Sequence, residues 1–353
     1  MDDLQRRPIP PIAWLLTGGT AVALVAMAIP TLHVHGTDGF FERGHDSLFF
    51  RFTAYTPFGT GRAFVAAGYP NEIAYRYGRI GLPFLSWVFA LGRSWLVPWT
   101  LIGVNLAAIA AVPGLAAVLA DEYNAPPVAG AAVLLSSVLF IRGVIYAEPL
   151  LIACILFAYV LEARRHHKSA LAMFAFAILV KESAVLALVP WIWTSLRRRD
   201  LRRAGEFAAA TVPYALWAIW VRVRIGEFPF LAHTLSRSEA IGWPFSGLHY
   251  IQVHRTNDHA AVLTVVIVTV ALCCIGAFVA RDLPIGGFTA LLAVLFLSLG
   301  PNALRYSAET LRLLSVPQVF ALLCIAVAIG RRLRPQRDPA PGQTELPSSG
   351  ARN

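Results

Sequence analysis

One acidic residue of this 353-residue chain stands in a position suited to act as a base. Asp46 lies in GHDSLFFRFTAY, where Gly44 and His45 precede apolar residues at helical spacing. A carboxylate commonly accepts the proton of a reacting hydroxyl group. An Asp at the start of a helical pattern is also typical of an N-cap or first-turn residue, so both roles are open for Asp46.

Other acids and one lysine extend the set of candidates. Asp38, in GTDG, has the signature of a turn, and it is the alternative to Asp46 as the base. Glu148, in YAEPL, either starts a helix or is a buried carboxylate of a binding site. Lys181 and Glu182, in LVKES, lie between two short apolar runs. Three roles are open for them: an ion pair with each other, a cap on the next helix, or contacts with a ligand.

Arginines supply candidate ligands for an anion, because the planar guanidinium binds phosphate oxygens in pairs. Arg305 and Arg312 lie seven residues apart in PNALRYSAETLRLL, before the last apolar run. Arg76 and Arg79 lie three residues apart in YRYGR. We predict that Arg305 and Arg312 bind a phosphate or pyrophosphate. For other single arginines, a salt bridge or a snorkelling side chain is the preferred interpretation.

Signatures of other chemistries do not occur in the sequence. It contains no CxxC pair, no Gly-rich phosphate loop, no HExxH and no GxSxG. His33 and His35 could hold a metal ion, but a surface loop is the preferred interpretation. The sequence therefore predicts neither a metal site nor a nucleotide site.

Composition decides the class of protein in which these residues act. Apolar residues make up 57% of the chain and charged residues 14%, with a mean hydropathy of +0.61. Soluble domains carry about 25% charged residues. The composition excludes a soluble enzyme, a disordered chain and a nucleic-acid-binding domain. It predicts an all-α, polytopic membrane protein.

We expect about ten membrane spans, with the first span uncleaved, at residues 12–29, 95–119, 128–141, 149–161, 169–180, 184–196, 207–221, 260–280, 283–299 and 313–329. Several are shorter than the ~20 residues that cross a bilayer. Charges interrupt the short runs between 128 and 196, and charge at membrane depth is tolerated where it lines a water-filled cavity. We therefore expect a cavity that opens to one side of the membrane.

Clusters of positive charge fix the expected orientation. Residues 164–168, 197–203 and 331–337 are rich in arginine and should be cytoplasmic, as should both termini, in the cell membrane. The apolar stretch 80–91 is predicted to lie on the outer surface, because a crossing there would place the first cluster outside. The chain is then one membrane domain (1–335) with outer loops at 31–94, which carries surface helices, and at 222–259, followed by a disordered cytoplasmic tail (336–353).

Fourteen of the thirty Lys and Arg residues fall on the outer side of this topology, where membrane proteins normally carry few. They are Arg43, Arg51, Arg62, Arg76, Arg79, Arg93, Arg142, Lys181, Arg222, Arg224, Arg237, Arg255, Arg305 and Arg312. This excess predicts an anionic ligand on the outer face.

Five short stretches resemble the GT-C superfamily of polytopic membrane glycosyltransferases. HDSLFFRFTAYTPFG is similar to the start of its first surface helix, and YRYGRIGLPFLSWVFALG to the second. AEPLL and AILVKESAVLALVPWIW resemble its short paired spans, and ETLRLLSVPQVF the arginine-bearing start of a late span. The resemblance covers about residues 1–335 in organisation.

The resemblance implies a sugar donor carried on polyprenyl phosphate and an acceptor hydroxyl on a glycan or lipid. Asp46 would be the catalytic base of an inverting transfer. Arg305, Arg312 and Lys181 would hold the lipid phosphate, with Arg76, Arg79, Glu148 and Glu182 also binding substrate. Some relatives use a divalent metal ion, although no cluster of ligands here demands one.

Two other functions remain open at this point. A transporter or lipid flippase requires polar residues along a path through the whole membrane. A non-catalytic membrane scaffold requires no convergence of Asp46, Glu148, Lys181 and Arg312. The positions of these four side chains therefore discriminate between the three functions.

Overall fold

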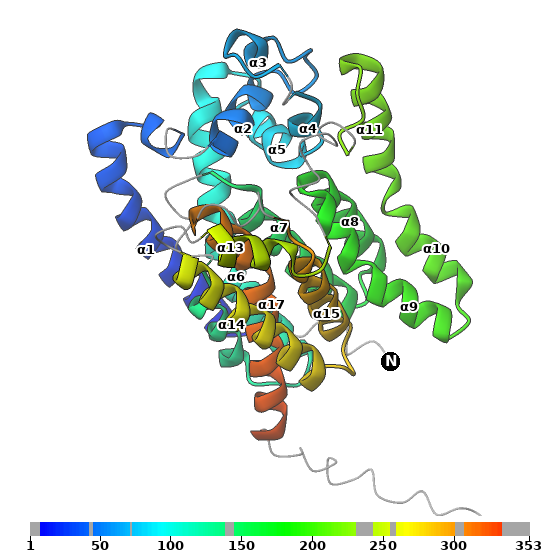
Figure 1. The fold of residues 1–353 in the computed structure, drawn as a ribbon. Helices are drawn as coiled ribbons and strands as arrows, with labels where there is room; N and C mark the ends of the chain where they lie inside the picture. Colours follow the sequence, from blue (N-terminus) through cyan, green and yellow to red (C-terminus); the bar gives the residue numbers. More distant parts are fainter. Residues whose placement is uncertain are drawn as a thin grey trace, which may run out of the picture.

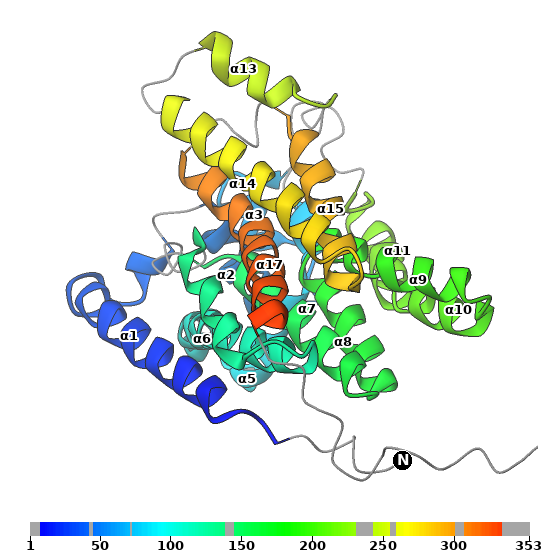
Figure 2. The same ribbon diagram turned by 90° about the horizontal axis from the view of Figure 1, so that it is seen from below.

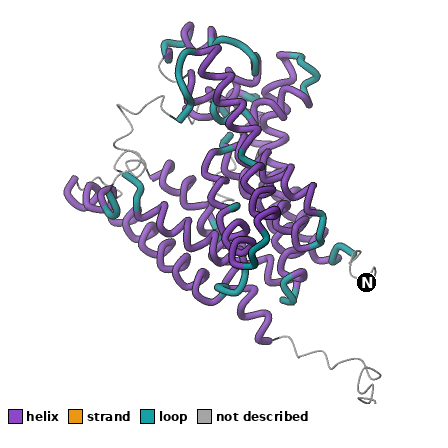
Figure 3. The backbone as a smooth tube through the Cα atoms, turned by 90° about the vertical axis from the view of Figure 1, so that its right-hand side faces the viewer, coloured by secondary structure: helices purple, strands orange, loops and turns teal. Residues whose placement is uncertain are grey.

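The computed structural model describes residues 8–41, 45–70, 73–137, 145–230, 243–254, 259–300 and 307–333. Helices, joined by turns and loops, form the regular secondary structure of these residues (Figure 3). The helices are α1 (Pro11–His35), η2 (Asp38–Phe40), α2 (His45–Tyr55), α3 (Arg62–Ala66), α4 (Ile73–Tyr77), α5 (Gly81–Phe89), η4 (Ser94–Leu96), α6 (Val97–Glu122), η5 (Pro127–Leu135), α7 (Ala147–Ala163), α8 (His167–Val180), η7 (Glu182–Ala187), α9 (Val189–Arg197), α10 (Leu201–Ala209), α11 (Val212–Ile225), α13 (Ser246–His254), α14 (His259–Val279), α15 (Pro284–Leu297) and α17 (Ser307–Leu333). The predicted all-α class is confirmed for these residues.

Within the described residues, four helical stretches are long and apolar enough to cross a membrane. They are Pro11–His35, Ser94–Glu122, Ala260–Val279 and Thr310–Leu333, of 20 to 29 residues each. About 20 apolar residues suffice to cross the hydrocarbon core. Each of the four contains most or all of one expected span, so the expectation of a membrane-embedded helical protein is confirmed to this extent.

The long helices differ in how much of their apolar surface the protein covers. α17 lies in the middle of the bundle and contacts α6, α7, α14 and α15 (Figure 2). α1 lies at the edge and leaves large apolar side chains exposed, such as Trp14, Leu15 and Val22. Exposed apolar surface of this extent marks contact with a membrane or a partner. A helix of this length and composition is suited to lie in a membrane.

The other expected spans correspond to shorter helices, and prolines divide two of them. The expected span 184–196 consists of η7 followed by α9, with Pro190 in the first turn of α9. The expected span 207–221 is split between α10 and α11, and Pro213 lies in the first turn of α11. Proline fits the first turn of a helix, where no intrahelical N–H bond is lost, and it favours a new start over continuation.

The expected span 128–141 differs most from the prediction. Its described part belongs to η5, a 3-10 helix of nine residues. At ~2.0 Å per residue such a helix covers about 18 Å, less than the hydrocarbon thickness. η5 packs instead against α6 and α17, and Gly130 allows this approach, because a Cβ there would lie 2.2 Å from the backbone N of Ala117.

The helices between the first two long helices form a cap at one end of the bundle. α2, α3, α4 and α5 lie together at the top of Figure 1, and α5 packs against α2, α6 and α8. α5 has nine residues and is too short to cross a bilayer, as expected for stretch 80–91. The cap brings α2 and α4 over the ends of α7, α8 and α17.

Two of the arginine-rich clusters lie at the opposite end of the molecule. The connection between α9 and α10, which carries Arg198 and Arg199, and the C-terminal end of α17, which carries Arg331 and Arg332, point away from the cap (Figure 1). The predicted tail at 336–353 lies outside the described residues.

We predict that Gly130→Ala lowers the free energy of unfolding by about 1–3 kcal/mol, because the new methyl group would overlap the α6 backbone, which cannot move aside alone. Gly103→Ala, in α6 itself, is the matched control, since nothing lies within 4 Å of a Cβ there. Thermal unfolding of both variants in detergent gives the comparison. Equal unfolding temperatures would contradict the tight contact between η5 and α6.

Candidate functional site

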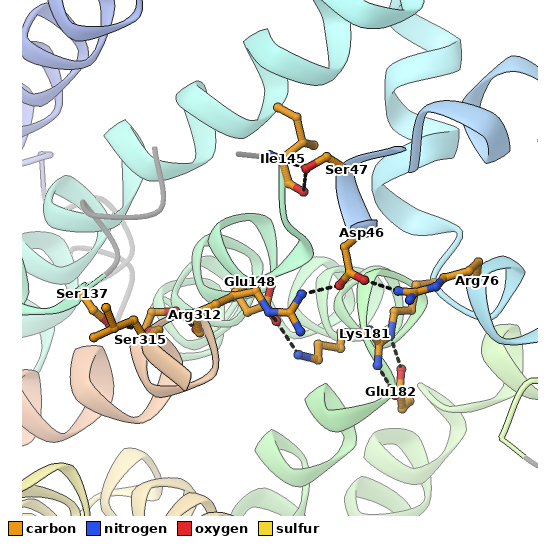
Figure 4. A network of polar contacts seen from close by, with 12 residues as sticks. Asp46, Ser47, Arg76, Ser137, Ile145, Glu148, Lys181, Glu182, Arg312 and Ser315 are labelled. Carbon is orange, nitrogen blue, oxygen red and sulfur yellow. Dashed lines mark hydrogen bonds and ion pairs between the residues drawn. The ribbon is translucent and has the colours of Figure 1, made fainter. Parts of the chain in front are cut away.

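Asp46 lies at the centre of a group of buried charges beneath the cap. It belongs to the first turn of α2, and its two carboxylate oxygens contact two different arginines. Oδ1 accepts a hydrogen bond from Arg76 of α4, and Oδ2 accepts one from Arg312 of α17 (Figure 4). Residues from three separate parts of the chain therefore meet at one buried carboxylate.

Glu148 is the second carboxylate of this group. Lys181 Nζ lies 2.6 Å from Glu148 Oε1, and Arg312 Nε lies 3.4 Å from the same oxygen. Only 2% of Glu148 is exposed. Arg312 thus interacts with two carboxylates and links α2, α7 and α17.

Glu182 is the third carboxylate, and it pairs with Arg79. Arg79 Nη2 and Nε lie 3.0 and 3.3 Å from its two oxygens, an arrangement of the bidentate kind. The guanidiniums of Arg79 and Arg76 lie 4.4 and 4.8 Å from the ring centre of Tyr75, which joins this pair to the other charges. We call the seven residues Asp46, Arg76, Arg79, Glu148, Lys181, Glu182 and Arg312 the charge cluster.

Local backbone geometry explains how the sequence brings these side chains together. Ser47 Oγ donates to the carbonyl of Ile145 and accepts from its N–H, both at 3.1 Å, which fixes the start of α2 against the start of α7. Lys181 is extended, with φ −159° and ψ 129°. Successive side chains of extended backbone point to opposite sides, so Lys181 and Glu182 reach different partners.

The carboxylates of the charge cluster are held in their ionised forms. Burial alone would raise the pKa of Asp46, but the charges of Arg76 and Arg312 outweigh it and hold the pKa far below its usual range. Burial likewise opposes ionisation of Glu182, and Arg79 nevertheless lowers its pKa from 4.5 to about 2. The charges of Glu182 and Asp46 help to raise the pKa of Arg79, although burial opposes this.

The charge cluster contains four cations and three carboxylates, and therefore carries one surplus positive charge among its described members. Charge interactions are stronger at buried sites than in water, because the effective dielectric constant is lower.

The structure brings together seven of the eight residues predicted from the sequence to form the site. Arg305, the eighth, lies outside the described residues, as does Arg142. The alternative base Asp38 lies elsewhere, because it is exposed on η2 and pairs with Arg51 at 2.7 Å. Arg51 therefore has the salt-bridge role that was the preferred interpretation for a single arginine.

Four contacting residues escaped the sequence prediction, and one of them is Phe49, whose ring centre lies 4.4 Å from Arg76 Cζ. Ser47 positions α2, while Tyr75 and Tyr146 lie under the guanidiniums, with Arg312 Cζ 4.8 Å from the Tyr146 ring centre. An aromatic residue beside each predicted charge, in YRYGR and YAEPL, is the signal that could have identified the tyrosines. No sequence feature marks Ser47.

A divalent metal ion does not fit the charge cluster. Each of its carboxylates faces an arginine or a lysine, and the described residues contain no group of three or more His, Cys, Asp and Glu suited to a metal ion. His33 and His35 lie in the last turn of α1 and not in a surface loop, because the helix continues past Pro30.

Comparisons with models of protein families, with characterised proteins and with solved structures each find no match to this chain.

We predict that Lys181→Met lowers the free energy of unfolding by about 3–5 kcal/mol, because it removes one partner of a buried ion pair. The double variant Lys181→Met/Glu148→Gln should recover part of this loss. Arg331→Gln is the control, since its partner Asp282 is half exposed and such surface pairs contribute less than about 1 kcal/mol. Unfolding of the three variants in detergent gives the comparison, and a Lys181→Met value as small as the control would contradict the buried pair.

Glu182 should also make stability depend on pH. Its pKa is lower in the folded protein than the ordinary 4.5, so the unfolded chain binds the proton more readily. The contribution of the pair with Arg79 should be complete above about pH 5 and disappear as the pH falls toward about 2. Unfolding temperatures of the wild type and Glu182→Gln should therefore converge below about pH 4. A difference that is constant with pH would count against this ion pair.

Proposed function

We propose that this protein is a membrane glycosyltransferase of the GT-C type. It moves a sugar from a polyprenyl-phosphate donor to an acceptor hydroxyl on a glycan or lipid at the outer face of the cell membrane. About ten membrane passages, counting the shorter helices, and cytoplasmic termini belong to this proposal.

The observation that supports the proposal is a buried carboxylate placed between arginines from two distant helices. Asp46 supplies a group that can accept a proton, and Arg76 and Arg312 supply groups that can bind a phosphate. Both requirements of sugar transfer from a lipid phosphate, a base and an anion site, lie within one set of contacts.

The proposed reaction uses these residues in one displacement. Asp46 accepts the proton of the acceptor hydroxyl, whose oxygen forms a bond to the anomeric carbon. The bond from this carbon to the phosphate oxygen breaks, and its electron pair leaves with the lipid phosphate. Arg312, Arg76 and Lys181 stabilise the charge on the departing group, and attack opposite to it inverts the anomeric centre.

The distribution of charge supports a site at one face rather than a pathway across the membrane. The charge cluster lies under the cap, whereas the described middle parts of α6 and α17 are apolar and buried. A transporter would need polar groups to continue through the bundle.

We predict that Asp46→Asn reduces sugar transfer at least 10²-fold, comparable to the loss of a main electrostatic group in other enzymes. Purified protein in lipid vesicles, a polyprenyl-phosphate sugar and analysis of the products by mass spectrometry provide the measurement. Asp38→Asn is the matched control and should retain full activity, because Asp38 lies outside the charge cluster. Full activity of Asp46→Asn would exclude this base, and lipid movement across the vesicle without transfer would favour a transporter.

A further inference from the structure

The two arginines that we propose as phosphate ligands are occupied by the proposed base. Arg76 donates to one oxygen of Asp46 and Arg312 to the other. Charge-assisted contacts of this kind are among the strongest hydrogen bonds in proteins. A carboxylate held on both oxygens in this way is poorly placed to accept a further proton from a substrate hydroxyl.

The electrostatic state of Asp46 agrees with this geometry. Its pKa is held far below the usual range by the two arginines. A general base works best when its pKa lies near the working pH, so the paired carboxylate is a weak base. Removing the arginines from it would restore its basicity.

Aromatic rings hold the two guanidiniums in place. The Cζ atom of Arg76 lies 4.4 Å from the ring centre of Phe49, and that of Arg312 lies 4.8 Å from the ring centre of Tyr146. Arg312 is held further by Glu148, at 3.4 Å. Asp46 has a short side chain in the first turn of its helix, and a change of rotamer alone can move it. The carboxylate, rather than the arginines, is therefore the group that can be displaced.

Resting on the proposed function, we infer that the Asp46 carboxylate occupies the phosphate site of the ligand-free protein and becomes a base only when the donor phosphate displaces it. The donor phosphate is a phosphodiester with one negative charge. It replaces one negative carboxylate between Arg76 and Arg312, so the local charge balance is kept. The acceptor hydroxyl is then deprotonated only when the donor is bound, and donor binding precedes acceptor activation.

The test measures how tightly the anion site binds geranylgeranyl phosphate, a soluble representative of the departing lipid phosphate. Asp46→Asn keeps the shape of the side chain but removes the competing charge. We expect it to bind this probe about 10-fold more tightly than the wild type, because a site that is open in only part of the molecules binds more weakly in that proportion. Isothermal titration in detergent gives the two dissociation constants.

Glu182→Gln is the charge-matched control. It removes the same charge from the charge cluster but leaves Asp46 between its two arginines. A smaller gain in affinity than that of Asp46→Asn supports displacement. An equal gain in both variants, or unchanged or weaker binding in Asp46→Asn, overturns the inference.

A measurement on the wild type decides the matter if Asp46→Asn does not fold. Infrared difference spectra with and without geranylgeranyl phosphate should contain a shift of a carboxylate stretching band, because Asp46 loses two arginine partners. The absence of such a shift at saturating probe overturns the inference.

The outcomes separate the inference from the proposed function. If Asp46→Asn binds the probe more tightly but the wild type transfers no sugar, the inference that phosphate displaces the carboxylate is supported and the proposed transferase function is rejected. If the wild type transfers sugar but Asp46→Asn binds the probe no more tightly, the proposed transferase function is supported and the inference that phosphate displaces the carboxylate is rejected.

Discussion

The contact between Arg312 and Asp46 is the interaction on which the arrangement of this protein depends. It joins residues 266 positions apart, one in the first turn of α2 and one near the start of α17. Through Glu148 the same arginine also reaches α7 and Lys181. Ion pairs thus connect the cap to α17, the central helix of the bundle.

Buried charges of this number are expensive, because each loses its hydration on folding. The described cluster limits that cost by pairing every carboxylate with at least one cation and by placing aromatic rings under the arginines. Apolar side chains of similar volume would fill the same space at lower cost. Stability alone therefore does not explain why seven charged residues lie at one place.

The apolar part of the molecule and the charge cluster serve different purposes. α1 and α14 expose apolar side chains that suit a bilayer, while α6 and α17 are largely buried. The shorter helices α7 and α8 end beneath the cap, and the extended residue Lys181 directs charge into the space there.

The helical class, the long apolar helices and the residue types of the site can be predicted from the amino-acid sequence alone. Composition and run length carry this information, because they reflect how each residue partitions between water and hydrocarbon. The pairing of those residues instead depends on contacts between distant parts of the chain. Lys181 and Glu182 are neighbours in sequence but bind Glu148 and Arg79, since the extended backbone separates their side chains. Asp46 and Arg312 lie 266 positions apart, and Ser47 holds α2 beside the start of α7 through a contact between residues 98 positions apart, so no local pattern encodes their pairing.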